Sequence, residues 1–256
     1  MMNESKIFTK IMYVLFILLV NAFISVYGYV VADAKAEYQM PMARSMGSYQ
    51  KSAPSKNIAN EKKRLLKTVS KNRGSYDAWR RLAEILYVEK NYGNCLQALE
   101  NLLQLEPGDV RGNILLGEVL LARKEGTKAV AQFQKLANMV PDSAQARYKL
   151  GLAQTLAGDD ASAAMELQKA ASLAPELAEA ALALAELKMK SGRTEEAIKN
   201  LENLIQKKPA FVPAYIALGK VYLSKEDREK AFETFKKIVV VAPKDPRGPY
   251  YMGIVQ

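Results

Sequence analysis

Five prolines recur at a constant interval of 34 residues: Pro107, Pro141, Pro175, Pro209 and Pro243. Each follows a run of helix-forming residues, such as LLQLE or ASLA. Proline has no backbone N–H and its ring clashes with the preceding turn, so it is typical of positions just past a helix end. A helix stop at a fixed period predicts a single supersecondary unit repeated along the chain.

The period divides the chain into five repeat units and part of a sixth. Turn signals lie in the middle of each unit, as in KNYGN, AGDD and SGRT, so each unit is predicted to form two helices joined by a short turn. The predicted units are 76–109, 110–143, 144–177, 178–211 and 212–245, with a partial unit at 246–256.

Four positions within the units carry the packing signal, and they alternate large and small residues. Position seven holds Leu82, Leu116, Leu150, Leu184, Leu218 and Met252; position eight holds Ala83, Gly117, Gly151, Ala185, Gly219 and Gly253; position twenty holds Cys95, Ala129, Ala163, Ala197 and Ala231; position twenty-four holds Leu99, Phe133, Leu167, Leu201 and Phe235. Small residues let two helix backbones approach closely. Because neither helix can bury its apolar stripe alone, neighbouring units must stack, and the fold class is all-α.

These columns resemble the tetratricopeptide repeat (TPR) family, whose pattern is W-x2-L-G-x2-Y, then A-x3-F, then P. Trp79 and Leu82 match in the first unit, and Gly219, Tyr222 and Phe235 match in the fifth, whereas Gln154 and Lys188 replace the aromatic residue of the first helix. The resemblance covers residues 76–256 and implies a right-handed α-solenoid of stacked helix–turn–helix units that binds other proteins. The alternative, an ordinary helical bundle, has no reason to keep one period.

Composition argues against several functions. The formal charge of +10 is concentrated in residues 1–75, which carry a net +8, and residues 76–256 carry only +2 without a basic stripe of the kind nucleic acid requires. The chain has no histidine and one cysteine, Cys95, and it contains neither a Walker A motif nor a dinucleotide-binding glycine motif. We therefore expect no enzyme activity, no cofactor, no metal site and no small-molecule substrate.

Residues 1–34 are predicted to form either a cleaved signal peptide or an N-terminal transmembrane anchor. Residues 11–32 are almost wholly apolar, follow a basic start and precede small-residue cleavage patterns. Either form would export the repeats to the periplasm or cell envelope. The opposite orientation, with the repeats facing the cytoplasm, stays open because Lys35, Arg44 and Lys51 flank the other side. Residues 35–56 are predicted to be a linker.

Residues 57–75 are predicted to form a capping half-repeat helix that buries Leu65 and Val69 against the first unit. Its cations are also candidates for contact with anionic lipid. These cations are Lys62, Lys63, Arg64, Lys67 and Lys71.

The resemblance also implies a concave groove lined by positions two, five, nine and twelve of the first helices. There the sequence places an apolar track flanked by acidic side chains, which fits an amphipathic helix or an extended apolar peptide. The candidate groove residues are Arg80, Glu84, Tyr87, Ile114, Glu118, Leu121, Tyr148, Leu152, Leu182, Glu186, Met189, Ile216, Lys220 and Tyr250. Packing between units is the alternative role of the apolar ones.

The sequence thus predicts a scaffold that holds a partner protein, in an envelope assembly, secretion or biogenesis complex, with a membrane-tethered adaptor facing the cytoplasm as the alternative. Tyr251, Met252 and Val255 lie in the partial sixth unit, without a second helix to cover them. We expect this end to fray, to pair with another chain or to belong to a longer protein.

Overall fold

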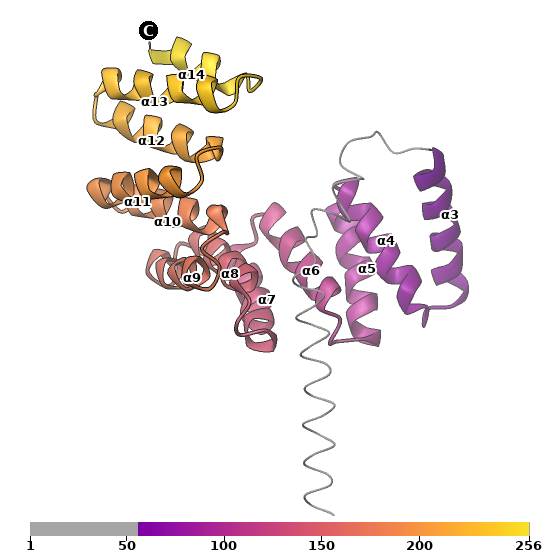
Figure 1. Ribbon diagram of the computed structural model, residues 1–256. Helices are drawn as coiled ribbons and strands as arrows, with labels where there is room; N and C mark the ends of the chain where they lie inside the picture. The colour runs from indigo at the N-terminus through magenta and orange to yellow at the C-terminus, as the bar shows by residue number, and fades with distance from the viewer. Residues whose placement is uncertain (1–55, 256) are drawn as a thin grey trace, which may run out of the picture. The chain divides into compact units, whose positions relative to one another are not determined.

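The computed structural model describes residues 56–255 (Figure 1). Across this range the chain forms twelve helices and no strand. The predicted signal or anchor segment and the predicted linker up to residue 55 lie outside the described residues. The prediction of an all-α fold of stacked helix–turn–helix units is confirmed.

The first helix of each full repeat unit begins at residue 76, 110, 144, 178 or 212. Each proline of the 34-residue series is the second residue past the end of a second helix, as Pro107 is after α5. The helices are α3 (Lys56–Lys71), α4 (Tyr76–Val88), α5 (Tyr92–Leu105), α6 (Val110–Ala122), α7 (Gly126–Met139), α8 (Ala144–Ala157), α9 (Asp160–Leu173), α10 (Ala178–Lys190), α11 (Thr194–Lys207), α12 (Val212–Ser224), α13 (Arg228–Val241) and α14 (Arg247–Val255).

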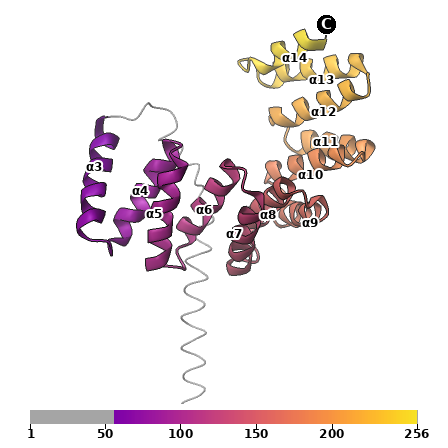
Figure 2. The same ribbon diagram turned by 180° about the vertical axis from the view of Figure 1, so that it is seen from behind.

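The described chain divides into two compact bodies. The N-terminal body comprises residues up to Leu115 together with Asn138–Val140, and the C-terminal body comprises Leu116–Ala137 and the residues from Pro141 onward. In the N-terminal body, α3 packs on α4 and α4 on α5. In the C-terminal body each helix from α8 to α14 packs on the next, and the first helices α8, α10 and α12 also contact one another in series (Figures 1 and 2).

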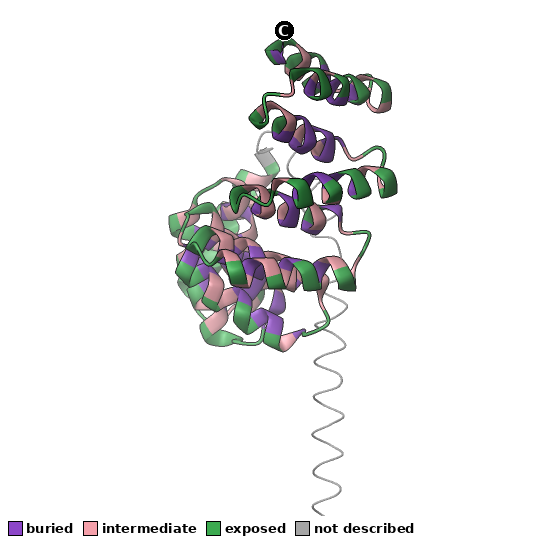
Figure 3. Ribbon diagram, turned by 90° about the vertical axis from the view of Figure 1, so that its left-hand side faces the viewer, coloured by how far each residue is buried: buried purple, intermediate pink, exposed green. Residues whose placement is uncertain are grey.

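The core of each repeat unit is a contact between a small residue on its first helix and a large residue on its second. All five residues at position twenty have no exposed surface, and those at position twenty-four are at most 1% exposed. Glycine at position eight faces phenylalanine in two units, Gly117 with Phe133 and Gly219 with Phe235. In the two full units with alanine at position eight, the sequence has leucine at position twenty-four instead. In four of the five full units the two positions therefore trade volume, as close packing favours, and in the remaining unit Gly151 faces the smaller Leu167. Figure 3 shows the resulting alternation of buried and exposed residues along the helices.

The turn between the two helices of every full unit contains one left-handed residue at the same position. Gly158 and Gly192 adopt φ of 86° and 76°, but Lys90, Lys124 and Glu226 adopt φ of 57°, 60° and 61°. A Cβ disfavours this conformation, so glycine is the usual residue there. The repeat geometry therefore imposes the left-handed turn even where the sequence supplies lysine or glutamate.

A second recurring feature ties the first helix of four of the five full units to the carbonyl group at the preceding repeat boundary. The Tyr215 hydroxyl donates to the carbonyl of Pro209 at 2.9 Å, and Asn113 Nδ2 donates to that of Pro107 at 3.1 Å. Trp79 Nε1 and Arg147 Nε make the equivalent bonds, each to the carbonyl six residues earlier. Four different side chains thus perform one task at position four, which explains why only Trp79 matches the TPR tryptophan.

Three residues of the predicted core columns depart from the prediction. Leu116 is only half-buried, as is Met252, and Gly253 is exposed with nothing within 4 Å of the place a Cβ would occupy. Gly253 differs from Gly219 because no residue described in the structure supplies the second-helix side chain that would fill it. At the same end Val255 is 8% exposed, and Tyr251 stacks on Phe235 with ring centroids 5.0 Å apart. Helix α14 is therefore covered by α13 on one side.

Candidate partner-binding surface

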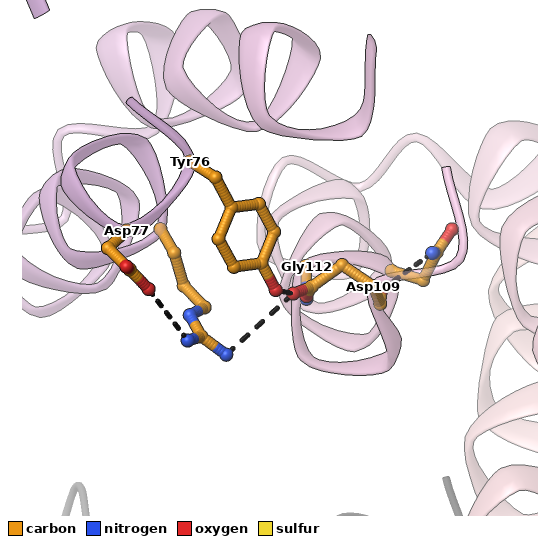
Figure 4. A network of polar contacts seen from close by, with 6 residues as sticks. Tyr76, Asp77, Asp109 and Gly112 are labelled. Carbon is orange, nitrogen blue, oxygen red and sulfur yellow. Dashed lines mark hydrogen bonds and ion pairs between the residues drawn. The ribbon is translucent and has the colours of Figure 1, made fainter. Parts of the chain in front are cut away.

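In the N-terminal body, the candidate groove residue Arg80 belongs to a polar network centred on Asp109 (Figure 4). The Asp109 carboxylate accepts hydrogen bonds from the Tyr76 hydroxyl and from the backbone N–H of Gly112, and its side chain is 2% exposed. Arg80 lies 3.8 Å from Asp109 and 3.2 Å from Asp77. Asp109 therefore caps the N-terminus of α6 and links it to α4.

The other two candidates on α4 also have partners within the N-terminal body. Glu84 forms a 3.0 Å ion pair with Arg81, and the ring of Tyr87 lies 6.1 Å from that of Tyr92. These side chains are half-buried. Arg80, Glu84 and Tyr87 therefore stabilise the fold locally, and both charged side chains among them have a partner of opposite charge.

The placement of Ile114 in an accessible groove is wrong. Ile114 is 6% exposed, and its neighbours Gly112, Asn113 and Leu115 are buried as well. A helical turn that is buried on all sides has no free face. Ile114 is therefore a core residue and is unavailable to a partner.

In the C-terminal body, four candidates form what we call the apolar track: Tyr148 and Leu152 on α8, Leu182 on α10 and Ile216 on α12. All four are half-buried. Tyr148 packs against the core cluster of Ala163, Leu167, Leu184 and Leu187, and Leu182 packs against the next cluster along the body. Ile216 packs against the last cluster of the body, so Tyr148, Leu182 and Ile216 each have one side in the core and a remainder that is accessible. Leu121 and Met189 are half-buried too, and Tyr250 is 65% exposed.

Carboxylates surround Tyr148. Burial raises the pKa of its hydroxyl to about 12, and the negative charges of Glu179, Glu118 and Glu186 contribute to that rise. Tyr148 therefore stays protonated at neutral pH and can donate a hydrogen bond. The sequence analysis missed Glu179, although it lies at position two, one of the four positions assigned to the concave face.

The charges along the track are only partly compensated. Glu118 forms a 2.5 Å ion pair with Lys149, and the ammonium group of Lys220 lies 5.6 Å from the centre of the Tyr251 ring. Glu179 and Glu186 are exposed and form no ion pair among the described residues. The apolar track is therefore bordered on α10 by two carboxylates that have no ion-pair partner among the described residues. Burial raises the pKa of Glu186, and the nearby positive charge of Lys220 partly offsets that rise.

Helix α3 places its candidate lipid-contact residues in two different environments. Lys62 donates to both carboxylate oxygens of Glu89, at 2.8 and 2.6 Å, and so forms part of the contact between α3 and the repeats. Lys63, Arg64, Lys67 and Lys71 are exposed. On the same helix Val69 is 5% exposed and Leu65 is half-buried, so this helix covers α4 with the predicted residues.

The described residues give no sign of a metal centre or of a membrane span. Between Lys56 and Val255 no group of three or more Cys, Asp or Glu side chains is arranged to hold a metal ion. In the same range no helix combines the length and the apolar character that crossing a bilayer requires.

Comparison with solved structures supports a repeat scaffold. The fold matches a structure of MamA protein, with 25% identity over 66% of this chain and 92% of that chain and a TM-score of 0.56. It also matches TTC0263, a thermophilic TPR protein of Thermus thermophilus, with 20% identity over 71% of this chain and 98% of that one and a TM-score of 0.57. YrrB, described as a TPR protein with an unusual peptide-binding site, matches with 20% identity over 73% and 96% and a TM-score of 0.52. No curated protein gives a significant match.

Repeated helix pairs with small-to-large packing and an accessible face on the first helices define a TPR-type scaffold, a class typical of protein–protein interaction. The sequence matches the family model described as the tetratricopeptide repeat protein 21 ARM repeat over residues 81–238. The chain belongs to this family.

Proposed function

We propose that the C-terminal body binds a segment of a partner protein along the apolar track. The observation that carries the proposal is that Tyr148, Leu152, Leu182 and Ile216 remain half-buried although the core columns of their units are already filled. Accessible apolar side chains in a row across three packed helices are typical of interaction surfaces. Direct contact between adjacent first helices makes the row continuous from α8 to α12.

The chemistry of the track favours an amphipathic helix or an extended peptide. Apolar anchors of the partner would cover the half-buried side chains, while the Tyr148 hydroxyl would donate to a carbonyl or hydroxyl group of the partner. The amide-and-cation clamp with which some TPR proteins hold a terminal carboxylate is not part of the proposal, because Glu118 and Glu186 stand at position nine.

The test compares two triple variants by site-specific photo-crosslinking. A photo-reactive residue at Leu152 should crosslink the partner in the wild-type chain, and Y148S/L182S/I216S should abolish the crosslink. The matched control, M165S/L173S/V240S, removes three large side chains from second helices, where they are 59%, 47% and 76% exposed. It should keep the crosslink.

Unfolding in urea separates binding from packing. Leu150 has no exposed surface, so Leu150→Ala sets the scale for a core variant at about 2–5 kcal/mol. If the serine variant of the track loses several times as much free energy of unfolding as Leu150→Ala, the three residues serve packing. If it stays folded and still crosslinks, the partner binds elsewhere. Either result rejects the proposal.

The cellular setting is a further part of the proposal, supported by the apolar stretch at residues 11–32. It assigns the scaffold to an assembly, secretion or biogenesis complex of the cell envelope, with the repeats outside the cytoplasm. A reporter that is active only outside the cytoplasm, fused after Lys56, should give signal. Signal from a cytoplasmic reporter alone would favour the alternative, an adaptor that is tethered to the membrane and faces the cytoplasm.

A further inference from the structure

Helix α3 has one carboxylate, Glu61, and the fold turns it inward. Arg81 of α4 donates to both oxygens of Glu61, at 2.7 and 3.2 Å. This contact, like that of Lys62 with Glu89, uses charges of α3 to hold the helix against the repeats. As a result, the remaining surface of α3 has no negative charge of its own.

The outward side of α3 carries four exposed cations: Lys63, Arg64, Lys67 and Lys71. None of them forms an ion pair with another residue that the structure describes. At 3.6 residues per turn the four side chains fall within an arc of about 100°, on the side of the helix opposite Val69. Leu66, which is 49% exposed, lies beside this arc, about 60° beyond Lys63 on the helix circumference. We call these five residues the basic face of α3.

We propose that the basic face of α3 lies against the anionic headgroups of a lipid bilayer. Cations close to an anionic bilayer surface are attracted to it, and an adjacent exposed leucine adds apolar contact with the interface. This role is separate from partner binding on the apolar track, which lies in the other body.

Two observations favour a bilayer over nucleic acid or an acidic protein. In the described chain the net positive charge is concentrated in residues 56–75, which hold seven Lys/Arg and one Glu, whereas residues 76–256 carry a net charge of only +2. The basic face also has no aromatic side chain on which a base could stack. The face is also close in sequence to the apolar stretch at 11–32. Residues 33–55 connect the two, and even a fully extended chain of that length spans at most roughly 80 Å.

The experiment places an environment-sensitive dye at the centre of the basic face. Cys95 is the only cysteine of the chain and is fully buried, so a cysteine introduced at the exposed position Asn60 can be labelled selectively. The full chain is reconstituted with liposomes of phosphatidylcholine alone or with about 30% phosphatidylglycerol. Flotation measures membrane association, and the dye emission reports whether α3 touches the surface.

We expect a blue shift and protection from an aqueous quencher only in the anionic liposomes, with both lost at high salt because surface charges are screened. The variant K63Q/R64Q/K67Q/K71Q should abolish the signal, since each cation near an anionic surface contributes roughly fivefold to the affinity. Glutamine has nearly the helix propensity of lysine and arginine, so the helix should persist, and circular dichroism checks this.

Two controls match the test. K199Q/K207Q/K237Q/K244Q removes four exposed lysines from the C-terminal body and should leave the signal unchanged. A dye at Asn203, exposed on α11, should show no shift in either liposome.

A shift in both types of liposome would show that tethering alone brings α3 to the membrane, and the proposal would be wrong. Equal loss of signal in the two glutamine variants would attribute the effect to net charge rather than to α3. A floating chain whose dye stays in water in anionic liposomes would also overturn the proposal, and it would leave the proposed membrane anchor and the proposed partner binding intact.

Discussion

The contact between Gly219 and Phe235 gives the sharpest prediction about stability. A Cβ at Gly219 would lie 2.3 Å from Cε1 and 2.4 Å from Cζ of Phe235, far inside ordinary contact distance. The ring cannot easily retreat, because it has no exposed surface and stacks on Tyr251. Gly219→Ala should therefore destabilise the C-terminal body, although alanine is the better helix former.

The magnitude follows from two opposing effects. Overpacking a filled core costs about 1–3 kcal/mol, and replacing glycine inside a helix returns about 0.5–1 kcal/mol. The expected net loss is about 0.5–2 kcal/mol. Phe235→Leu alone should lose roughly 1–2 kcal/mol because it leaves a cavity. The double variant recreates the pair that Ala185 and Leu201 have in the preceding unit. It should lose less than the sum of the single variants by about 1–2 kcal/mol.

Urea unfolding, monitored by circular dichroism, measures how much free energy of unfolding the two single variants and the double variant lose. Stacked repeats can unfold in parts, so hydrogen exchange of the α12 and α13 amides should accompany it. Gly253→Ala is the matched control, since nothing lies within 4 Å of its Cβ position, and it should be neutral or slightly stabilising. Additivity of the two single variants within about 0.5 kcal/mol would refute the explanation by volume, as would an equal loss in Gly253→Ala.

Three other predictions concern backbone, charge and reactivity. Lys124→Gly should raise the free energy of unfolding by about 0.5–1 kcal/mol because Lys124 adopts φ of 60°, which glycine tolerates better. Gly192→Ala, at φ of 76°, should lower it by a similar amount. Changes of the same sign in the two variants, measured by urea unfolding, would contradict this explanation. The Arg247 side chain and backbone N–H lower the pKa of Asp245 to about 2, so the stability that this carboxylate contributes is complete above pH 4 and is lost as the pH falls toward 2. As the pH falls from 4 toward 2, amide exchange of α14 should accelerate more in the wild-type chain than in Asp245→Asn. Identical pH profiles would show that protonation of Asp245 does not control the stability of α14. Burial raises the pKa of the Cys95 thiol to about 12, so a thiol reagent at pH 8 should react only after unfolding, and rapid reaction with the native chain would show that Cys95 is accessible.

The candidate surface could be predicted only in part. Position five is accessible at Tyr148, Leu182 and Ile216 but buried at Ile114, although the sequence places apolar or aromatic residues at all four. One-dimensional spacing fixes the face of a helix that a residue occupies, but it does not determine how much of that face neighbouring helices cover. In the same way, spacing puts Lys62 on the Val69 side of its helix and Lys63 on the other side, but only the structure shows that Lys62 reaches Glu89.

The sequence by itself determined the repeat. A proline every 34 residues sets where each second helix must end, and the alternation of small and large residues at fixed positions requires that helices pack in pairs, because these are constraints of local sterics and volume. Tertiary structure alone decided the left-handed turn residues at Lys90, Lys124 and Glu226, which no local preference selects. It also decided which charges are paired: Glu179 and Glu186 form no ion pair with a described residue, whereas Glu61 turns toward Arg81. Pairing of charges depends on the distance between residues from different helices, and only the stacking of those helices sets that distance.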